Sequence, residues 1–471
     1  MELEQVSENI YEIPQDDEMN VPARVYASPD LLEEVKGDKT LQQIRNVATI
    51  PGIQKYSIVM PDGHQGYGFP IGGVAAVDNE SGVISPGGIG YDINCGVRVL
   101  RTELDYEDIE GEKEKIVNMI YDRIPCGLGK GGYLDINRND LDGILEYGVE
   151  WMESEGFATP EDLRHCEENG RLPGNPDKVP DEAKDRGVNQ VGSLGSGNHF
   201  LEVQRVTDLY SEETAEAYGL RENQILVMIH SGSRGLGHQV CTTYLRRFEK
   251  NYPGIVDNLA DKELMYAPIG DPLAEDYREA MYAAANFAWC NRQAMTEGIR
   301  DVFGELFGSH PELIYDVCHN IAKEETHDVD GEEKELLVHR KGATRSFPAC
   351  RPEVPGVYSE NGQPVLIPGN MGAHSYILSG GERSLDISFG STAHGAGRLM
   401  SRTQAKKDYW GGDVQDDLAE EGIVVKAKSG STIAEEAPGV YKDVDEVIAV
   451  SDGHGIGEKV ARMYPVVNIK G

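Results

Sequence analysis

The chain has 471 residues, of which 39% are hydrophobic. It contains no run of about 18 apolar residues, so we expect no membrane-spanning helix. Its 81 acidic residues outnumber its 44 basic residues and give a net charge of −37. This balance argues against a generally basic nucleic-acid-binding surface, although a local basic groove remains compatible with it. We expect a salt-adapted protein, rather than a metal-storage protein or one with an acidic tail.

Length and cysteine usage bound the organisation of the protein. The chain is too long for one core of ordinary size, so its length predicts two or more lobes. The seven cysteines are scattered and odd in number, which favours a reducing cytosol over a disulfide framework. The acidic start MELEQVSENIYEIPQDDEMN lacks the apolar segment of a signal peptide. We therefore expect a cytoplasmic location.

Predicted secondary structure alternates irregularly along the chain. The first hundred residues mix short strands with glycine-rich loops, and residues 112–124 predict a helix. Residues 132–185 are polar and predict a surface-exposed helical insertion. Residues 273–303 carry apolar positions at three-to-four spacing and predict the longest helix.

Two turns complete this pattern. Asp330-Gly331 and Asn361-Gly362 each predict the turn of a β-hairpin. Because strands and helices follow no regular βαβ rhythm, the predicted fold class is α+β, with packed sheets and peripheral helices.

The motif YDINCGV places Asp92 three residues before Cys95 in a glycine-rich stretch. A carboxylate and a thiolate on one tight loop can both face a divalent cation. Once imidazoles join them, this donor set suits Zn²⁺ or Mn²⁺ better than Mg²⁺ or Ca²⁺. The structural alternative is a cysteine that fills a small space in the core and an aspartate that caps a turn.

Five of the twelve histidines stand at the ends of apolar runs or in glycine loops: His199, His230, His319, His374 and His394. Rigid strand ends commonly carry binding residues, and neutral imidazole is the commonest metal ligand. One such histidine alone would be explained by partial burial. Several of them beside the Asp-x-x-Cys motif favour a metal or catalytic site.

The loops SLGSGNH, HSGSRGLGH, IPGNMG and GSTAHGAGR let main-chain N–H groups approach an anion. We expect HGAGR to open a helix whose N-terminus favours phosphate. None of these loops is a Walker A motif, because no Gly-Lys-Ser/Thr follows the glycines. The arginines in or beside the loops, which are suited to bidentate phosphate binding, are Arg186, Arg234, Arg398 and Arg402.

Taken together, these motifs resemble the RtcB family of RNA ligases, GTP-dependent enzymes that rejoin split tRNA halves. The resemblance runs in order through MPDGHQGYGFPIGGV, VNQVGSLGSGNHFLEVQ, VMIHSGSRGLGHQV, YDVCHNIAKEE, HRKGATRSFP, STAHGAGRLMSRTQAKK and EEAPGVYKDVDEV to the terminal Lys-Gly. It implies one catalytic domain over residues 1–471, with a central metal and nucleotide cleft and an insertion near 132–185. With the acidic composition, it suggests a halophilic archaeon as the source.

The resemblance also implies roles for individual residues. Cys95 would bridge two Mn²⁺ ions, whose other ligands would be Asp92, His199, His230 and His319. His394 matches the histidine nucleophile that becomes guanylylated. The positions implied around the guanine nucleotide are Asn198, Phe200, Glu202, Asn320, Asn370, Met371, Ser375, Gly395, Ala396, Gly397, Tyr441 and Lys470. Arg186 and Arg234 match positions that hold RNA phosphate. Asn370 replaces the family's usual Ser and His374 is atypical, which leaves their contacts open.

The activity implied is a GTP- and Mn²⁺-dependent RNA ligase. Through a guanylyl-histidine, it would join 2′,3′-cyclic phosphate or 3′-phosphate ends to 5′-hydroxyl ends in tRNA splicing and RNA repair. The implied partners are RNA such as tRNA exon halves, GTP and an archease-type activating protein, and the implied state is a monomer that binds no membrane. Two alternatives stay open: a dinuclear metal-dependent RNA phosphodiesterase without guanylylation, and an acidic RNA-binding or chaperone subunit with a structural metal.

Overall fold

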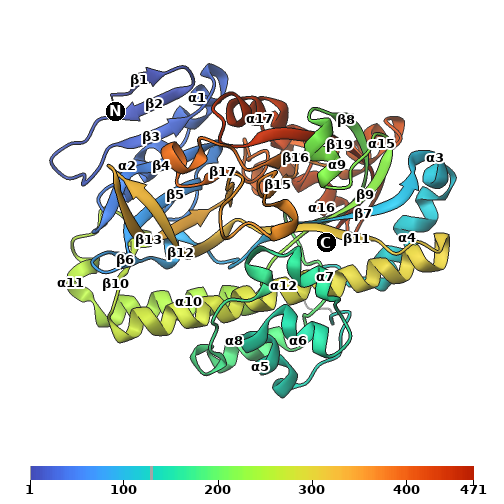
Figure 1. The fold of residues 1–471 in the computed structure, drawn as a ribbon, viewed down its shortest axis with the longest axis horizontal. Helices are drawn as coiled ribbons and strands as arrows, with labels where there is room; N and C mark the ends of the chain where they lie inside the picture. Colours follow the sequence, from blue (N-terminus) through green and yellow to red (C-terminus); the bar gives the residue numbers. More distant parts are fainter. Residues whose placement is uncertain (1, 128–130) are drawn as a thin grey trace.

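Two large β-sheets lie side by side in the computed structural model, which describes residues 2–127 and 131–471 (Figure 1). In the first sheet the strand order is β1 (Glu4–Ser7), β2 (Ile10–Ile13), β3 (Ala23–Tyr26), β4 (Ile53–His64), β5 (Ile71–Asp78), β13 (Glu332–Lys341) and β12 (Asn320–Val329). Neighbouring strands are antiparallel except for the parallel pair β3 and β4.

In the second sheet the order is β11 (Glu312–Cys318), β7 (Gly96–Asp105), β9 (Gln224–Ser231), β8 (Phe200–Leu209), β19 (Glu458–Lys470), β16 (Ser375–Ser379) and β15 (Pro364–Ile367). A further strand, β18 (Val424–Ala427), pairs in parallel with β19. The two-stranded pairs are β6 (Val83–Ile84) with β10 (Ala267–Pro268) and β14 (Ala343–Arg345) with β17 (Ser391–Ala393). The central strand β9 is buried along its whole length.

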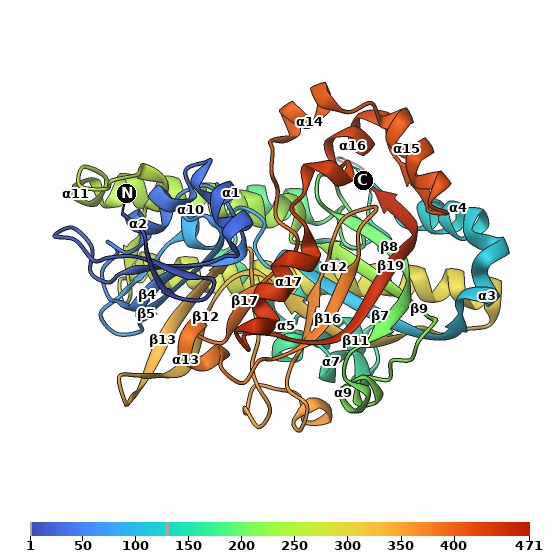
Figure 2. The ribbon, with the colours of Figure 1, turned by 90° about the horizontal axis from the view of Figure 1, so that it is seen from above.

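Helices lie around both sheets. Their bounds are α1 (Pro29–Lys36), α2 (Thr40–Val47), α3 (Tyr106–Ile109), α4 (Lys113–Arg123), α5 (Arg138–Tyr147), α6 (Val149–Ser154), α7 (Pro160–Arg164), α8 (Asp181–Gly187), α9 (Glu212–Ala217), α10 (Arg234–Asn251), α11 (Pro253–Val256), α12 (Pro272–Phe307), α13 (Ser384–Ser388), α14 (Arg402–Asp408), α15 (Gly411–Glu420), α16 (Gly430–Glu435) and α17 (Val444–Gly453). Seen from above, α14, α15 and α16 lie together beside the C-terminus (Figure 2). The predicted α+β class is confirmed.

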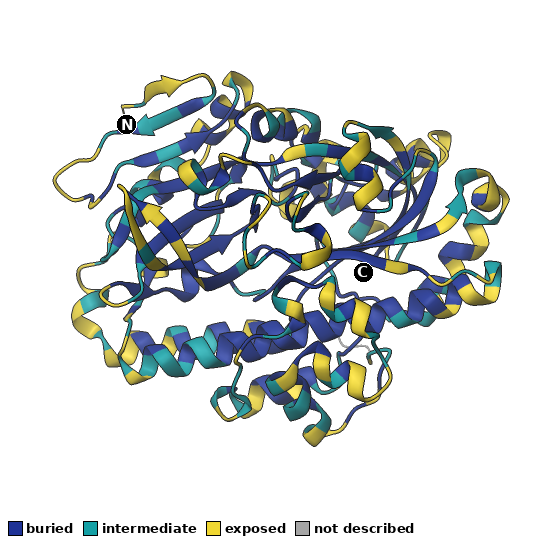
Figure 3. Ribbon diagram, in the orientation of Figure 1, coloured by how far each residue is buried: buried dark blue, intermediate teal, exposed yellow. Residues whose placement is uncertain are grey.

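The longest helix, α12, confirms the prediction for residues 273–303. Asp271 caps its N-terminus, where its side chain accepts the N–H of Leu273, and Pro272 occupies the first turn. Gly308, at a φ of 65°, ends it in the left-handed conformation. Residues 280–296 are buried on every side, because α12 lies between the second sheet and the helices of the insertion (Figures 1 and 3). This helix therefore packs against the second sheet, where it contacts β9.

The insertion near 132–185 is helical as predicted, but the prediction that it is surface-exposed is only half right. One face of α5 and α6 buries Leu141, Ile144 and Met152 towards α12, while the outer face is exposed (Figure 3). Glu167 is completely buried, accepts the N–H of Cys318 at 2.8 Å and pairs with Lys323. The polar composition of this insertion therefore did not reveal that one of its faces packs against the core.

Two local predictions are wrong. Asn361-Gly362 forms a turn that leads into β15 from a short 3₁₀ segment, Gly356–Tyr358, and β15 pairs with β16 instead. HGAGR opens no helix, since α14 begins only at Arg402. By contrast, Asp330-Gly331 does join β12 and β13, and α4 confirms the helix predicted for residues 112–124. Over the described ranges, we find no helix that is both long and apolar enough to cross a bilayer.

Candidate active site

The second sheet gathers four of the predicted site residues at one end. Cys95 directly precedes β7, His199 precedes β8, His230 lies near the end of β9, and His319 follows β11. The order β11-β7-β9-β8 is antiparallel throughout. The starts of β7 and β8 therefore lie beside the ends of β9 and β11, and the four side chains meet.

Cys95 lies at the centre of this group. Its Sγ is 3.4 Å from Nε2 of His199 and 3.2 Å from Nε2 of His230. The Nε2 atoms of His230 and His319 are 3.3 Å apart, and Oδ2 of Asp92 is 2.8 Å from Nε2 of His199. Two overlapping sets of three donors result, Cys95 with His230 and His319 and Cys95 with Asp92 and His199; within each, the donor atoms lie within 4.8 Å of one another.

The chemistry of these donors fits divalent transition metals. Burial lowers the pKa of His230 and His319 well below the ordinary value, so both imidazoles are neutral and can bind a cation. Burial, reinforced by Asp92, raises the pKa of the Cys95 thiol, so binding a cation must release its proton. Burial works against ionisation of Asp92, but His199 holds its pKa at about 2. Mixed sulfur, nitrogen and oxygen donors favour Mn²⁺ or Zn²⁺ over Mg²⁺ or Ca²⁺.

Hydrogen bonds with α12 and β12 hold the loop that carries Asp92 and Cys95. Asn94 has a φ of 51°, and its Nδ2 donates to the main-chain oxygen of Ala285 at 2.8 Å. Arg292 of the same helix donates to the main-chain oxygen of Asn94 at 2.8 Å. Asn320 donates to the main-chain oxygen of Asp92 at 3.1 Å. The donor atoms are therefore held in place before any cation binds.

His394 lies beside this cluster and is oriented by a buried carboxylate. Its ring centroid is 4.8 Å from that of His319. Its Nδ1 is 2.5 Å from Oδ2 of Asp62, which also accepts the main-chain N–H groups of His394 at 3.0 Å and Gly395 at 3.3 Å. The Asp62 side chain is fully buried. The proton therefore sits on Nδ1, and within the described part of the chain no hydrogen bond occupies the Nε2 lone pair.

A cleft of about 770 Å³ connects the cluster to His394. Asp92, Cys95, His319 and His394 line it, together with the segment 398–402. A cleft of this size accommodates a nucleotide.

Several positions predicted around the nucleotide form one buried polar layer. Glu202 accepts hydrogen bonds from Gln204 at 2.7 Å and from Asn468, and burial raises its pKa to about 7 although Lys470 opposes the shift. The Lys470 ammonium lies 4.8 Å from the centroid of the Phe200 ring. A buried carboxyl group with a pKa near neutrality therefore lies in the same layer as a cation and an aromatic ring.

Glu436 and Gln204 extend this layer. Glu436 is fully buried, pairs with Arg398 at 3.0 Å and accepts from the Tyr441 hydroxyl. Gln204 donates to Oγ of Ser375 at 3.0 Å. Phe200, Glu202, Ser375, Tyr441 and Lys470, which lie far apart in the sequence, are in this way brought together.

Other predicted positions are placed differently. The side chains of Met371 and Ala396 are buried in apolar clusters, so only their main-chain atoms could reach a ligand. Asn370 uses its Oδ1 to accept the N–H of Gly372 at 3.0 Å. Gly397, at a φ of 79°, lies so close to Asp62 that a Cβ would come within 2.3 Å of its main-chain oxygen. His374 lies outside the cluster, 3.5 Å from Asp445.

The predicted phosphate-binding arginines lie at the junction of α8 and α10. Arg234 begins α10, and its Nη1 is 2.9 Å from Nδ1 of His199. Arg186 is exposed in the last turn of α8, which packs against α10. Asn198 lies at the rim of the cleft, where its Oδ1 accepts from Arg402 at 3.5 Å.

Sequence reasoning missed two carboxylates of this site, Asp62 and Glu436. Both lie in motifs that carried the family resemblance, MPDGHQG and EEAPGVY. The available signal was an acidic residue inside a glycine-rich or proline-containing motif. The pairing of Asp62 with His394 could not be predicted, because the two residues lie 332 positions apart in the chain.

Comparison with known proteins identifies the family of this chain. A family described as tRNA-splicing ligase RtcB matches residues 43–471. The tRNA-splicing ligase RtcB of Thermococcus kodakarensis is 51% identical over 476 residues, with 100% of this chain and 99% of the relative covered. The proteins of the same name from Aeropyrum pernix and Nanoarchaeum equitans are 51% and 48% identical, with at least 99% of each chain covered. The predicted family is confirmed: the chain belongs to the RtcB family of tRNA-splicing ligases.

Proposed function

We propose that this ligase depends on GTP and Mn²⁺ and seals RNA through a guanylyl-histidine at His394. It would join 2′,3′-cyclic phosphate or 3′-phosphate ends to 5′-hydroxyl ends, in tRNA splicing and RNA repair. The observation that carries the proposal is the pairing of His394 Nδ1 with the buried Asp62 carboxylate, 2.5 Å away. It leaves the Nε2 lone pair for attack on phosphorus, beside a cluster of metal donors.

In the first step, Nε2 of His394 attacks the α-phosphorus of GTP. An N–P bond forms while the P–O bond to pyrophosphate breaks, and the positive charge that develops on the imidazole is stabilised by Asp62. The RNA 3′-phosphate oxygen then attacks the same phosphorus, and the N–P bond breaks to return the lone pair to His394. A cyclic phosphate must first be opened by water. Finally, the 5′-hydroxyl oxygen attacks the 3′-phosphorus, the P–O bond to GMP breaks, and the proton of the hydroxyl passes to water.

The residues that would hold two Mn²⁺ ions are Asp92, Cys95, His199, His230 and His319. When bound, the ions would neutralise charge on the phosphoryl oxygens. The neutral imidazoles and the ionised Asp92 support this assignment.

We propose that the buried polar layer binds the guanine nucleotide. A carboxylate at Glu202 could accept hydrogen bonds from the N–H groups of a guanine edge, and Lys470 could offset its charge. Ser375, Tyr441 and Phe200 would form the surrounding wall, with Asn198, Asn320 and Asn370 as further hydrogen-bonding groups. Met371, Gly395, Ala396 and Gly397 would contribute main-chain atoms.

For RNA, Arg186 and Arg234 are the proposed phosphate ligands, since one guanidinium group can donate hydrogen bonds to two phosphate oxygens at once. Asn198 lines the same cleft as His394. The family resemblance extends the proposal to tRNA exon halves as substrates, to a monomeric enzyme and to help from an archease-type activating protein.

Incubation with α-labelled GTP and Mn²⁺, followed by denaturation, tests the proposal. Label that survives denaturation in the wild type and is absent from His394→Ala is the expected result. A phosphodiesterase without guanylylation would cleave RNA with no need for GTP and retain no label. A structural metal alone would give neither activity nor label.

A further inference from the structure

Three aromatic side chains form a cluster outside the metal and nucleotide positions, and two of them, Tyr67 and Tyr91, line the cleft. The rings of Tyr67 and Tyr91 meet edge to face, with centroids 6.1 Å apart. Tyr91 is stacked against His238, with centroids 4.9 Å apart and an angle of 25° between the planes. Tyr67 remains 60% exposed, and His238 is exposed on α10. The exposed Tyr67 ring is thus supported by Tyr91, which is itself stacked against His238.

The loop that presents Tyr67 is held rigidly. Gln43 both donates to the main-chain oxygen of Gly66 at 2.7 Å and accepts its N–H at 3.0 Å. Glu263 accepts the N–H of Gly68 at 3.0 Å. The buried ammonium of Lys341 donates to the main-chain oxygen of Tyr67. An exposed ring on a loop fixed on both sides loses little conformational entropy when it binds a ligand.

The cluster is also fixed relative to the nucleophile. Lys341, which holds the Tyr67 loop, directly precedes Gly342, where a Cβ would lie 3.1 Å from Cε1 of His394. Tyr67 and Tyr91 line the same cleft as Cys95 and His394. A group stacked on Tyr67 would therefore lie near the RNA end that reacts at His394.

Charge indicates which part of RNA would bind there. The carboxylate of Asp38 lines the cleft on this side, where it accepts the N–H of Gln65 at 2.8 Å, and Glu263 supports the neighbouring loop. Lys341 also lines the cleft here, but its ammonium already donates to the main-chain oxygens of Tyr67, Phe69 and Gly87. The two acids disfavour phosphate, whereas aromatic rings stack on any nucleobase. We propose that Tyr67, Tyr91 and His238 form a stacking site for a nucleobase of the substrate RNA next to the end being joined, an inference that rests on the proposed ligase function.

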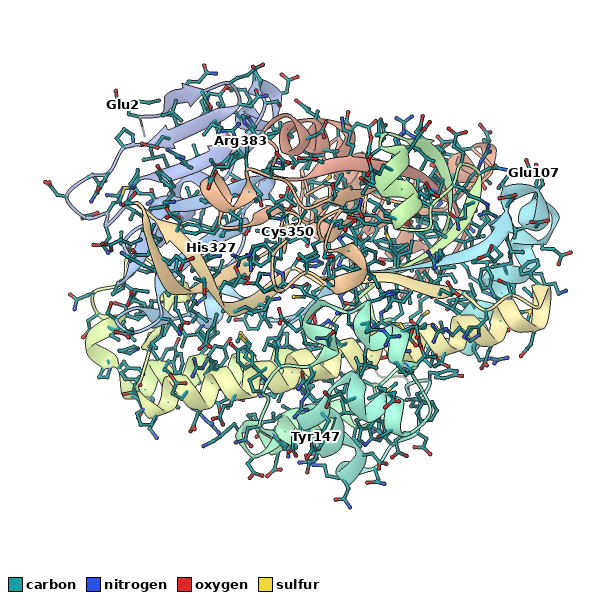
Figure 4. The ribbon with its side chains drawn as sticks, in the orientation of Figure 1. Glu2, Glu107, Tyr147, His327, Cys350 and Arg383 are labelled. Atoms are coloured by element: carbon teal, nitrogen blue, oxygen red, sulfur yellow. The ribbon has the colours of Figure 1, made fainter. Side chains whose placement is uncertain are left out.

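Equilibrium binding of short single-stranded RNAs at fixed salt tests this site. The probes carry either a normal or an abasic terminal nucleotide. The wild type should bind the normal probe roughly 5- to 150-fold more tightly, the range expected for one base stacked on an aromatic ring. Tyr67→Leu should lose this preference, whereas Tyr67→Phe should keep it. The matched control is Tyr147→Leu, which changes an exposed tyrosine of the insertion (Figure 4) that does not line the cleft, and it should behave as the wild type.

Two probes identify the strand: a 3′-phosphate RNA that is abasic at its 3′ end and a 5′-hydroxyl RNA that is abasic at its 5′ end. A preference that Tyr67→Leu abolishes for either probe supports the site and assigns the base. Equal binding of normal and abasic probes by the wild type, or an unchanged preference in Tyr67→Leu, would overturn it. Labelling of His394 by GTP needs no RNA, so it reports separately on the proposed function and on the folding of each variant.

Discussion

At the scale of single residues, His394 differs from two of the metal-ligand candidates, His230 and His319, in what Nδ1 contacts. Nδ1 of His394 faces a carboxylate, which would stabilise the charge that develops when Nε2 forms a bond to phosphorus. His230 and His319 have buried Nδ1 atoms with no hydrogen-bond partner in the described ranges, and their Nε2 atoms converge with the Cys95 sulfur. The third candidate, His199, has its Nδ1 3.1 Å from the main-chain oxygen of Leu194. The first arrangement suits a nucleophile and the second suits metal ligands.

Replacement of Cys95 tests the shared sulfur. Because Cys95 belongs to both donor sets, Cys95→Ala should lower the bound Mn²⁺ from two ions towards none and abolish ligation. The fold should survive, since the removed group is small. Metal content by mass spectrometry and a gel ligation assay measure both. Cys290→Ala, which removes a buried cysteine of α12, should retain metal and activity. Full metal content and full activity in Cys95→Ala would refute the shared ligand.

Asp62→Asn tests the orientation of the nucleophile. The amide cannot stabilise a charged imidazole as a carboxylate does, so guanylylation of His394 should slow by at least about 100-fold. Bound Mn²⁺ should be unchanged, because Asp62 belongs to neither donor set. Asp330→Asn, in the turn between β12 and β13, serves as the control. Guanylylation at the wild-type rate in Asp62→Asn would contradict the role.

At the scale of secondary-structure elements, the sequence predicted what local periodicity and turn chemistry determine. The long helix α12 and the β12–β13 hairpin are such cases. The helix expected at HGAGR fails because Gly397 has a φ of 79° and because the main chain of Gly397 and Leu399 forms hydrogen bonds with the distant residues Lys442 and Val440. The Asn361-Gly362 hairpin fails because β15 finds its partner in β16. Five metal-ligand candidates were recognisable from their own motifs, whereas Asp62 and Glu436 depend on contacts between distant segments.

The α7–α12 contact predicts a step in acid stability. Asp162 of α7 accepts two hydrogen bonds from Arg300 of α12, at 2.7 and 2.8 Å. Burial opposes its ionisation, but Arg300 lowers its pKa to about 2. The pKa of Asp162 is lower in the folded than in the unfolded state, so the ion pair adds about 2 kcal/mol to the free energy of unfolding above pH 4. This stabilisation is lost as the pH falls towards 2.

Urea unfolding of Asp162→Asn and wild type across this range measures the effect. The difference in the free energy of unfolding should shrink as the pH falls from 4 to 2. Glu161→Gln, at an exposed neighbouring position, should differ little from the wild type at any pH. A constant difference between Asp162→Asn and the wild type would show that the ion pair has no such role.

At the scale of the whole molecule, a net charge of −37 coexists with arginines at the active site: Arg398 and Arg402 line the cleft, and Arg234 contacts His199. Repulsion among the acidic groups weakens as salt is added, because the screening length falls to about 3 Å at 1 M. Contacts between arginine and phosphate weaken with salt as well. Folding and RNA binding therefore respond to salt in opposite directions.

The thermal midpoint should accordingly rise between dilute buffer and molar KCl, while the affinity for RNA should fall. Ligation should be fastest at an intermediate, elevated salt concentration. Thermal unfolding, RNA binding and ligation measured on one salt series provide the comparison. A thermal midpoint that is highest in dilute buffer would refute the proposed adaptation to salt.

We propose that His394 is a nucleophile used only to form the activated end. A gel assay of His394→Ala on two substrates, with a metal count, distinguishes this role from that of a metal ligand. The variant should fail to join a 3′-phosphate end to a 5′-hydroxyl end, yet should still seal RNA that carries a preformed guanylylated 3′-phosphate, with its bound Mn²⁺ unchanged. Equal failure on both substrates together with loss of metal would contradict the claim and identify His394 as a metal ligand.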